Sequence, residues 1–459
     1  MSTSVLDATL QRELDAVPDS DAFLGPDELS VQLSAIAARA GLPAPSTIGR
    51  SREGRPIECL TVGDGPRAAL VFGTPHPNEP IGGLTTLHLA RELAADRALG
   101  LASAYRWYIV PCVDPDGLAL NSGWLRGPFD LSTYARNFYR PAGDEQVEWS
   151  FPFTYKRASF EKPLPETEAL MELIDDVRPA LMCSLHNSEL GGAYYYLSRP
   201  QPGLHTTLQA IPKHFGLGLH AGEAEAPYIQ QIDSGIYLWP EATASYDHAE
   251  ALGLDPLTFM TGSSSSTYAA RHGTLTLVSE LPYWRDPLAG DRSPSGTTYA
   301  TALRQQADAI EEVVILLRRG LEAVGCEAVA PSPFLRATSY FARALDGMPI
   351  GARRRADDAV SRREATMAEL RSLHDVAHSF RLRYVGMLRR GLETLPDGLV
   401  DAALSREVEQ RHEAWLADAS EHTTAEPLPI RLLVGTQYGA TLAAADHLAT
   451  QAVPPATVL

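Results

Sequence analysis

The feature that most constrains the fold is a regular alternation of short apolar runs with helical segments. Five apolar runs have the length and composition of strands. They span residues 56–63, 67–74, 105–113, 179–187 and 274–284. Before and between them lie segments whose apolar residues recur at helical spacing. These segments span residues 25–41, 81–98, 165–177 and 203–216. The alternation predicts an α/β fold with a mixed, mostly parallel sheet flanked by helices.

The first two apolar runs, 56–63 and 67–74, are separated by a short turn and are expected to be neighbouring strands. A long helix over 299–325 is expected to close the α/β part of the chain. Beyond it, residues 352–391 have helical periodicity, and residues 428–449 contain one strand-like run and a final helix.

The 459 residues are many for one compact domain. We divide them into an N-terminal segment (1–26), a main α/β domain (27–330) and a mainly helical C-terminal extension (331–459). Two roles for the extension stay open. It caps the entrance to a site on the main domain, or it builds a homo-oligomer.

Charge and composition exclude several classes of protein. The formal net charge of −18 argues against nucleic acid and anionic membranes as partners. No apolar run approaches the roughly 18 residues of a membrane span, and the N-terminus does not have the pattern of a signal peptide. The four cysteines show no C-x-x-C spacing, so neither a zinc ribbon nor a dense disulfide framework is indicated. A soluble, cytoplasmic protein is expected.

Candidate metal ligands follow the predicted strands. His76 and Glu79, in TPHPNEP (74–80), come directly after one strand, and His186, in SLHN, ends another. A catalytic zinc takes three protein ligands and keeps one position open, commonly with two ligands close in sequence and the third far away. H-x-x-E alone is a weak signal, so hydrogen-bonded loop residues remain the alternative interpretation at this point.

Six motifs in order resemble the funnelin zinc carboxypeptidases, over roughly residues 27–325. They are IGRSREGRPIECLTVG (48–63), HPNE (76–79), IVPCVDPDGL (109–118), ARNF (135–138), SLHN (184–187) and TLVSEL (276–281). The resemblance implies that His76, Glu79 and His186 bind one Zn²⁺ per chain. It also implies that Glu280 is the general base that takes a proton from water and passes it to the leaving amine.

The resemblance also implies two substrate arginines. Arg126 matches the residue that stabilises the oxyanion. Arg136 matches the residue that binds the terminal carboxylate of the substrate, where a forked guanidinium suits a carboxylate. Arg140 is the substitute if either assignment fails. The family's asparagine before the second arginine is replaced by Ala135, and Asn137 is the nearby amide expected to contact the substrate.

The family's mobile tyrosine aligns with Phe259, which has no hydroxyl to donate a hydrogen bond. Tyr268 is close in sequence and is the alternative for that role. Both residues are expected in the substrate-binding site.

The favoured function is therefore that of a zinc metallocarboxypeptidase, a hydrolase that removes the C-terminal residue from a peptide or peptide-like amide. One alternative is a zinc amidohydrolase acting on small amino-acid conjugates. The run GTPHPNEPIGG (73–83) is also similar to the H-G-N-E-P-x-G motif of the aspartoacylase and desuccinylase branch. The other alternative is a non-catalytic binding protein on the same fold.

Overall fold

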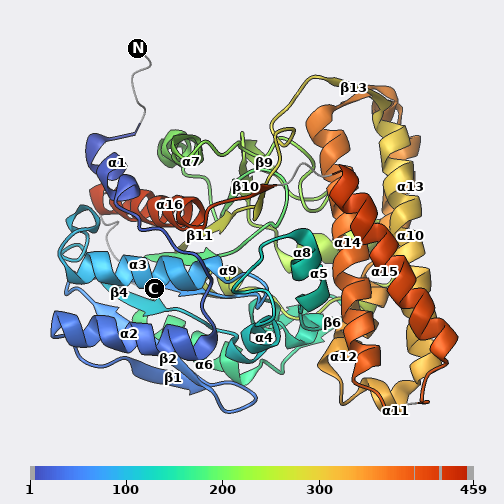
Figure 1. Cartoon of the computed structure of the whole chain (residues 1–459). Helices are drawn as coiled ribbons and strands as arrows, with labels where there is room; N and C mark the ends of the chain where they lie inside the picture. Colours follow the sequence, from blue (N-terminus) through green and yellow to red (C-terminus); the bar gives the residue numbers. More distant parts are fainter. Residues whose placement is uncertain (1–5, 397, 423–425, 452–459) are drawn as a thin grey trace.

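A nine-stranded mixed sheet forms the centre of the α/β part of the chain (Figure 1). The computed structural model describes residues 6–396, 398–422 and 426–451. In chain order the strands of this sheet are β1 (Ser46–Arg50), β2 (Pro56–Val62), β3 (Arg67–Gly73), β4 (Tyr105–Val110), β7 (Leu181–Leu185), β8 (Tyr194–Leu197), β9 (Gln231–Asp233), β10 (Ile236–Leu238) and β11 (Leu275–Glu280).

The strand order is β1-β2-β4-β3-β7-β11-β8-β10-β9. The central strands β4, β3, β7 and β11 are mutually parallel, whereas β1, β2, β8 and β9 each pair antiparallel with a neighbour. The α/β class and all five expected strands are confirmed. The expected pairing of the first two strands is wrong, because β4 lies between β2 and β3 and bonds to both.

Both faces of the sheet are covered, and strand β3 shows how. Ala69 and Val71 belong to the core cluster that includes helices α2, α3 and α16, whereas Leu70 and Phe72 belong to the cluster that includes α6. Successive side chains of a strand point to opposite faces, so an unbroken apolar run is required when both faces are covered. This is why the strand is apolar throughout.

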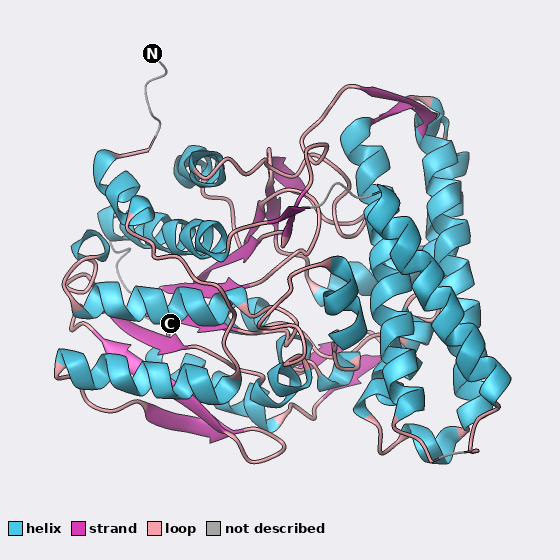
Figure 2. Cartoon of the chain, in the orientation of Figure 1, coloured by secondary structure: helices cyan, strands magenta, loops and turns pink. Residues whose placement is uncertain are grey.

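Helices surround the sheet, as Figure 2 shows by colour. They are α1 (Ala8–Asp15), α2 (Pro26–Ala40), α3 (Ile81–Ala94), α4 (Pro115–Leu120), α5 (Leu131–Asn137), α6 (Pro165–Val177), α7 (Pro202–His214), α8 (Ala242–Ala251) and α9 (Ser265–Ala270). Short strands pair outside the main sheet. They are β5 (Phe153–Tyr155) with β6 (Ala158–Phe160), β12 (Trp284–Arg285) with β15 (Glu426–Pro427), and β13 (Pro294–Thr298) with β14 (Glu364–Thr366).

A helical region begins at residue 299 and stands beside the α/β part (Figure 1). Its helices are α10 (Tyr299–Val324), α11 (Cys326–Val329), α12 (Pro333–Ala344), α13 (Gly347–Asp357), α14 (Met367–Glu393) and α15 (Ala402–His422). Helix α10 packs against α12, α13 and α14, so it belongs to this helical region. The helical region therefore starts at residue 299, and the domain boundary expected near residue 330 stays a prediction.

The last described helix, α16 (Ile430–Thr450), returns to the sheet and packs on α3, α7 and β7. The strand-like run expected after residue 428 is wrong, since these residues are helical. A helix covered on nearly all sides is apolar on nearly all sides, so its sequence does not show an amphipathic period. Within the described residues, no helix is both long and apolar enough to cross a membrane.

Candidate metal centre and substrate pocket

Three neighbouring parallel strands bring the candidate site together. The loop after β3 carries His76 and Glu79, the residue after β7 is His186, and the last residue of β11 is Glu280. Because β3, β7 and β11 are adjacent and parallel, their carboxyl ends meet at one edge of the sheet. Open α/β sheets bind ligands at this edge.

The loop after β3 is set by a close contact and a strained residue. A Cβ atom on Gly73 would lie 2.5 Å from the backbone of Gly82 in α3, so only glycine fits there. Thr74 then has a φ of 57°, a left-handed conformation that non-glycine residues rarely adopt. Together these features bend the chain sharply before His76.

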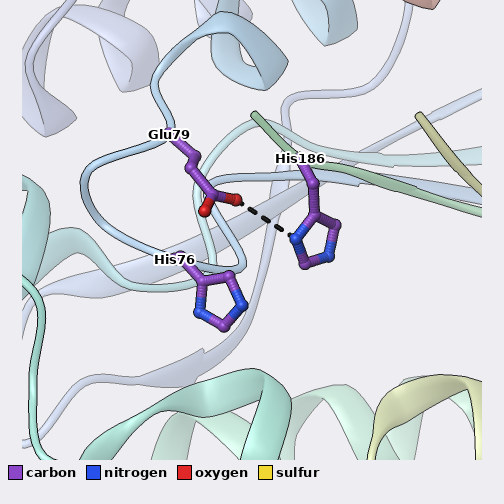
Figure 3. Close-up of side chains that lie close together, drawn as sticks. All are labelled: His76, Glu79 and His186. Carbon is purple, nitrogen blue, oxygen red and sulfur yellow. Dashed lines mark ion pairs between the residues drawn. The ribbon is translucent and has the colours of Figure 1, made fainter. Parts of the chain in front are cut away.

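The three side chains converge on one point (Figure 3). One ligand atom from each of His76, Glu79 and His186 lies within 4.8 Å of the other two. Nδ1 of His186 is 3.1 Å from Oε2 of Glu79, and the two imidazole ring centroids are 5.0 Å apart. Within the described part of the chain this is the one group of three such residues with metal-binding geometry.

The burial, hydrogen bonding and protonation of these ligand atoms fit a site that binds a metal cation. Nδ1 of His76 is buried and has no hydrogen-bond partner, which is costly unless a ligand completes it, and the buried Oε2 of Glu79 has only the 3.1 Å ion-pair contact with His186. Burial, and then the charge of Arg140, lowers the pKa of His76 well below its usual value, so its imidazole is neutral, as a metal ligand must be. Two histidines and one glutamate are a typical ligand set for catalytic zinc.

Two further ionisable groups adjoin the ligand cluster. Oε1 of Glu280 is 3.7 Å from Nδ1 of His186. Burial raises the pKa of Glu280 well above its usual value, and the carboxylates of Glu225 and Glu79 raise it further. On the other side, Nη1 of Arg140 donates to Oε1 of Glu79 at 3.1 Å.

The cluster lies in a pocket of about 540 Å³. One wall is aromatic, since Trp149 stacks on the ring of His76 and Trp239 stacks on Trp149 with 5.7 Å between ring centroids. The opposite wall comes from the helical region. It is lined by Tyr340, Phe341, Ala344, Leu345 and Met348 and by seven residues of α14 between Ser372 and Tyr384.

The pocket contains more acidic than basic side chains. Seven carboxylates line it, namely Glu79, Glu189, Glu223, Glu225, Glu241, Glu280 and Asp375. Its two arginines, Arg140 and Arg383, are already paired with Glu79 and Glu189. Among the described residues, Glu225 and Glu241 have no ion-pair partner. The pocket therefore favours a positive charge on whatever fills it.

The two arginines expected from the family resemblance lie elsewhere in this structure. Arg126 is 65% exposed and pairs with Glu28 of α2. Arg136 pairs with Glu413 of α15. Neither is among the residues that line the pocket. Arg140, the substitute, does line it.

Of the three other residues expected at the substrate site, one lines the pocket and two do not. Asn137 ends α5 and donates to the carbonyl of Thr133, away from the pocket. Tyr268 donates to Asp175 at 2.8 Å and does not line the pocket either. Phe259 does line it, and its carbonyl accepts a hydrogen bond of 3.1 Å from the hydroxyl of Tyr340.

Several pocket residues were not expected from the sequence. Trp149 and Trp239 carry no motif, and no local pattern distinguishes Arg383 from the other arginines of its helix. Glu189 could have been noticed from the sequence, because this acidic residue follows His186 closely in HNSEL (186–190).

A contact from the far end of the chain holds the backbone of the third ligand. Nε2 of Gln437, in α16, donates to the carbonyl of His186 at 2.8 Å. Oε1 of Gln437 accepts from the hydroxyl of Thr85 in α3, also at 2.8 Å. All three residues are buried. Helix α16 is therefore part of the support of the site.

The fold and the site define an α/β protein with a candidate His–Glu–His metal site at the carboxyl edge of its sheet. The family model described as zinc carboxypeptidase matches residues 36–252, which include all three candidate ligands. The matched segment is just under half of the chain, and over that segment the chain is similar to the zinc carboxypeptidase family. Among curated proteins, no significant match was found.

Several solved structures are similar to this chain at low sequence identity. Carboxypeptidase A from Helicoverpa armigera is 15% identical, with a TM-score of 0.39, and the match covers 77% of this chain and 80% of that one. Bovine thrombin-activatable fibrinolysis inhibitor is 14% identical, with a TM-score of 0.37, over 58% of this chain and 87% of that one. The murein-tripeptide amidase MpaA from Escherichia coli O157 is 20% identical, with a TM-score of 0.29, over 53% and 86%.

Proposed function

We propose that this chain is a zinc-dependent carboxypeptidase that hydrolyses the C-terminal residue of a peptide or peptide-like amide. The observation that carries the proposal is the meeting of the ligand cluster and Glu280 at the ends of three adjacent parallel strands. Zinc binding by His76, Glu79 and His186 is part of the proposal.

When bound, Zn²⁺ supplies a Lewis acid that polarises the scissile carbonyl and lowers the pKa of water. Glu280 accepts the proton of the attacking water and delivers it to the nitrogen of the leaving amine. The buried, acidic surroundings of Glu280 raise its pKa, which makes its carboxylate a stronger proton acceptor. The aromatic wall formed by Trp149 and Trp239 limits the access of bulk water.

Arg140 is the residue of choice for the anionic part of the substrate. When Glu79 directs its charge to a metal, the guanidinium of Arg140 becomes available to a carboxylate or an oxyanion. A second hydrogen bond, from Nε of Arg140 to Gln146 at 3.1 Å, holds this guanidinium at the pocket wall.

The experiment that tests the proposal measures zinc content and hydrolysis together. Wild type is expected to hold about one zinc per chain and to cleave peptides with a free C-terminal carboxylate but not their amidated forms. His186→Ala is expected to lose both zinc and activity. His214→Ala, which removes a histidine paired with Asp15 on the surface, is the control and should keep both. Wild-type protein without zinc, or zinc retained by His186→Ala, would refute the proposal.

A second candidate function is the hydrolysis of small amino-acid conjugates. It is favoured by the wall that α12 and α14 build across the pocket, which restricts the length of the substrate. It is also favoured by the position of Arg136, which is engaged by α15 instead of facing a substrate carboxylate. Cleavage of N-acyl amino acids without cleavage of peptides would select this function. A zinc-loaded protein that cleaves neither class would indicate the binding-protein alternative.

A further inference from the structure

Arg383 of helix α14 is a buried cation that reaches the candidate site from outside the segment matched by the family model. It lines the pocket, and its side chain is 13% exposed. Its Nη1 lies 2.7 Å from Oε2 of Glu189, whose side chain is 4% exposed. A buried charge of this kind persists only when it is paired, so the two side chains hold each other in place.

Glu189 connects this pair to both loops that carry the metal ligands. It lies three residues after His186 in the same loop. Its other oxygen, Oε1, accepts from Nδ2 of Asn78 at 3.1 Å, and Asn78 stands between His76 and Glu79 in the other loop. The hydroxyl of Tyr134 also donates to this oxygen. A single carboxylate therefore fixes the two loops relative to each other.

The backbone of Glu189 adds a second observation. Its φ is 69°, in the left-handed region that is unfavourable for a residue with a side chain. Such a conformation is retained only where the surroundings hold it. The surroundings here are the backbone N–H of Tyr283, which donates to the carbonyl of Glu189 at 2.8 Å, and the three partners of its carboxylate, of which Arg383 is the one that carries a charge.

The guanidinium of Arg383 is itself held by aromatic rings. The ring centroids of Phe138, Phe380 and Tyr384 lie 5.5, 5.6 and 5.4 Å from its central carbon. A flat, delocalised guanidinium suits such an aromatic setting better than a lysine ammonium does. Arg383 is thus held on one side by rings and on the other by Glu189.

We propose that Arg383 is a positioning residue for the metal centre. Acting through Glu189, it fixes the loop of His186 and, through Asn78, the loop of His76 and Glu79. The affinity of the centre for zinc then depends on the helical region. This inference rests on the proposed function only in taking zinc as the bound metal.

The test measures the zinc dissociation constant of the full chain by competition with a chelator. Arg383→Met is expected to bind zinc at least tenfold more weakly than wild type, and Arg383→Lys is expected to lie in between. The control is Arg381→Met, which breaks an ion pair of the same helix with Glu312 of α10 and, within the described residues, has no ion pair with the metal loops. It is expected to leave zinc affinity unchanged. If Arg383→Met does not fold, Arg383→Lys decides the question with a threefold or larger loss.

The route through Glu189 is tested with a double-mutant cycle. Glu189→Gln alone is expected to weaken zinc binding, and the addition of Arg383→Met is expected to cause little further loss, because both changes remove the same link. Losses that multiply independently would overturn the route, and wild-type affinity in both Arg383 variants would overturn the proposal. The two hypotheses fail separately. Tight zinc binding without any amide hydrolysis refutes the proposed function alone, whereas hydrolysis with unchanged zinc affinity in the Arg383 variants refutes this inference alone.

Discussion

Arg140 donates a 3.1 Å hydrogen bond to Oε1 of Glu79, and Oε2 of the same carboxylate is left facing His186. One carboxylate thus joins the candidate metal ligands to the arginine that we assign to the substrate. This relationship distinguishes Arg140 from the two arginines that the family resemblance indicated.

The first prediction compares these three arginines. Arg140→Gln is expected to raise KM for peptides with a free C-terminus at least tenfold. The change removes the guanidinium group that we assign to binding a substrate carboxylate in the pocket. Zinc content should not change. Arg126→Gln and Arg136→Gln should alter KM less than about twofold, since both side chains pair outside the pocket. Steady-state kinetics on zinc-loaded protein measures this. A large effect of Arg136→Gln alone would restore the family assignment.

The second prediction concerns the general base. Glu280→Gln is expected to lower kcat by roughly 10²- to 10⁴-fold, the range typical of a lost general base. Zinc should remain bound, since Glu280 is not one of the three ligands. The measurement is kcat with zinc stoichiometry on the same sample. Activity within tenfold of wild type would exclude Glu280 from proton transfer.

The third prediction concerns the charge of the substrate. Glu225 accepts hydrogen bonds from Tyr194 at 2.6 Å and Tyr196 at 3.0 Å, and it lines the pocket with no cationic partner among the described residues. We expect kcat/KM to be higher for substrates with a lysine or arginine side chain than for those with glutamate. Glu225→Gln should reduce this preference by about tenfold, the effect of roughly 1.4 kcal/mol. A preference that does not change in the variant would remove Glu225 from substrate selection.

The fourth prediction is a pH dependence of stability. Burial raises the pKa of Asp375 to about 7, and the nearby Asp286 contributes to the rise. Below about pH 4, near the usual pKa of aspartate, this carboxyl is protonated in both folded and unfolded chains. Between about pH 4 and pH 7 the unfolded chain releases the proton while the folded chain keeps it. The contribution of Asp375 to the free energy of unfolding therefore falls as pH rises, by up to about 1.4 kcal/mol per pH unit.

Asp375→Asn removes this titration and keeps a donor for Asp286. Denaturant unfolding of both proteins at pH 5, 6, 7 and 8 measures the difference. We expect the variant to gain stability relative to wild type from pH 5 to pH 7 and the difference to level off above pH 7. A constant difference across this range would show that the carboxyl does not titrate there.

The sequence was sufficient for the parts of the molecule that local pattern determines. The strands β3, β7 and β11 are apolar and bounded by turn residues, and the ligands directly follow them, so His76, Glu79 and His186 could be placed at one sheet edge. The order of β2, β4 and β3 could not be obtained, because a short turn between two runs does not reveal that a third strand inserts between them.

The arginines show why the rest of the site could not be predicted. Helix α5 ends at Asn137, and Phe138 is fully buried directly after it. The side chains of Arg136 and Arg140 therefore point in different directions. A comparison of sequence motifs does not reveal that change in the direction of the chain. Arg383 is one of several arginines of α14, and only tertiary structure brings this one to Glu189.

The contact between Gln437 and the carbonyl of His186 has a consequence for the order of events during synthesis. The two residues are 251 positions apart, so the third ligand leaves the ribosome long before the helix that holds its backbone. At about 5–20 residues per second this delay is on the order of tens of seconds. Throughout that interval a nascent chain has all three ligands but lacks part of their support. For the proposed zinc site, the full support of the ligands is therefore available only after most of the described chain has been made.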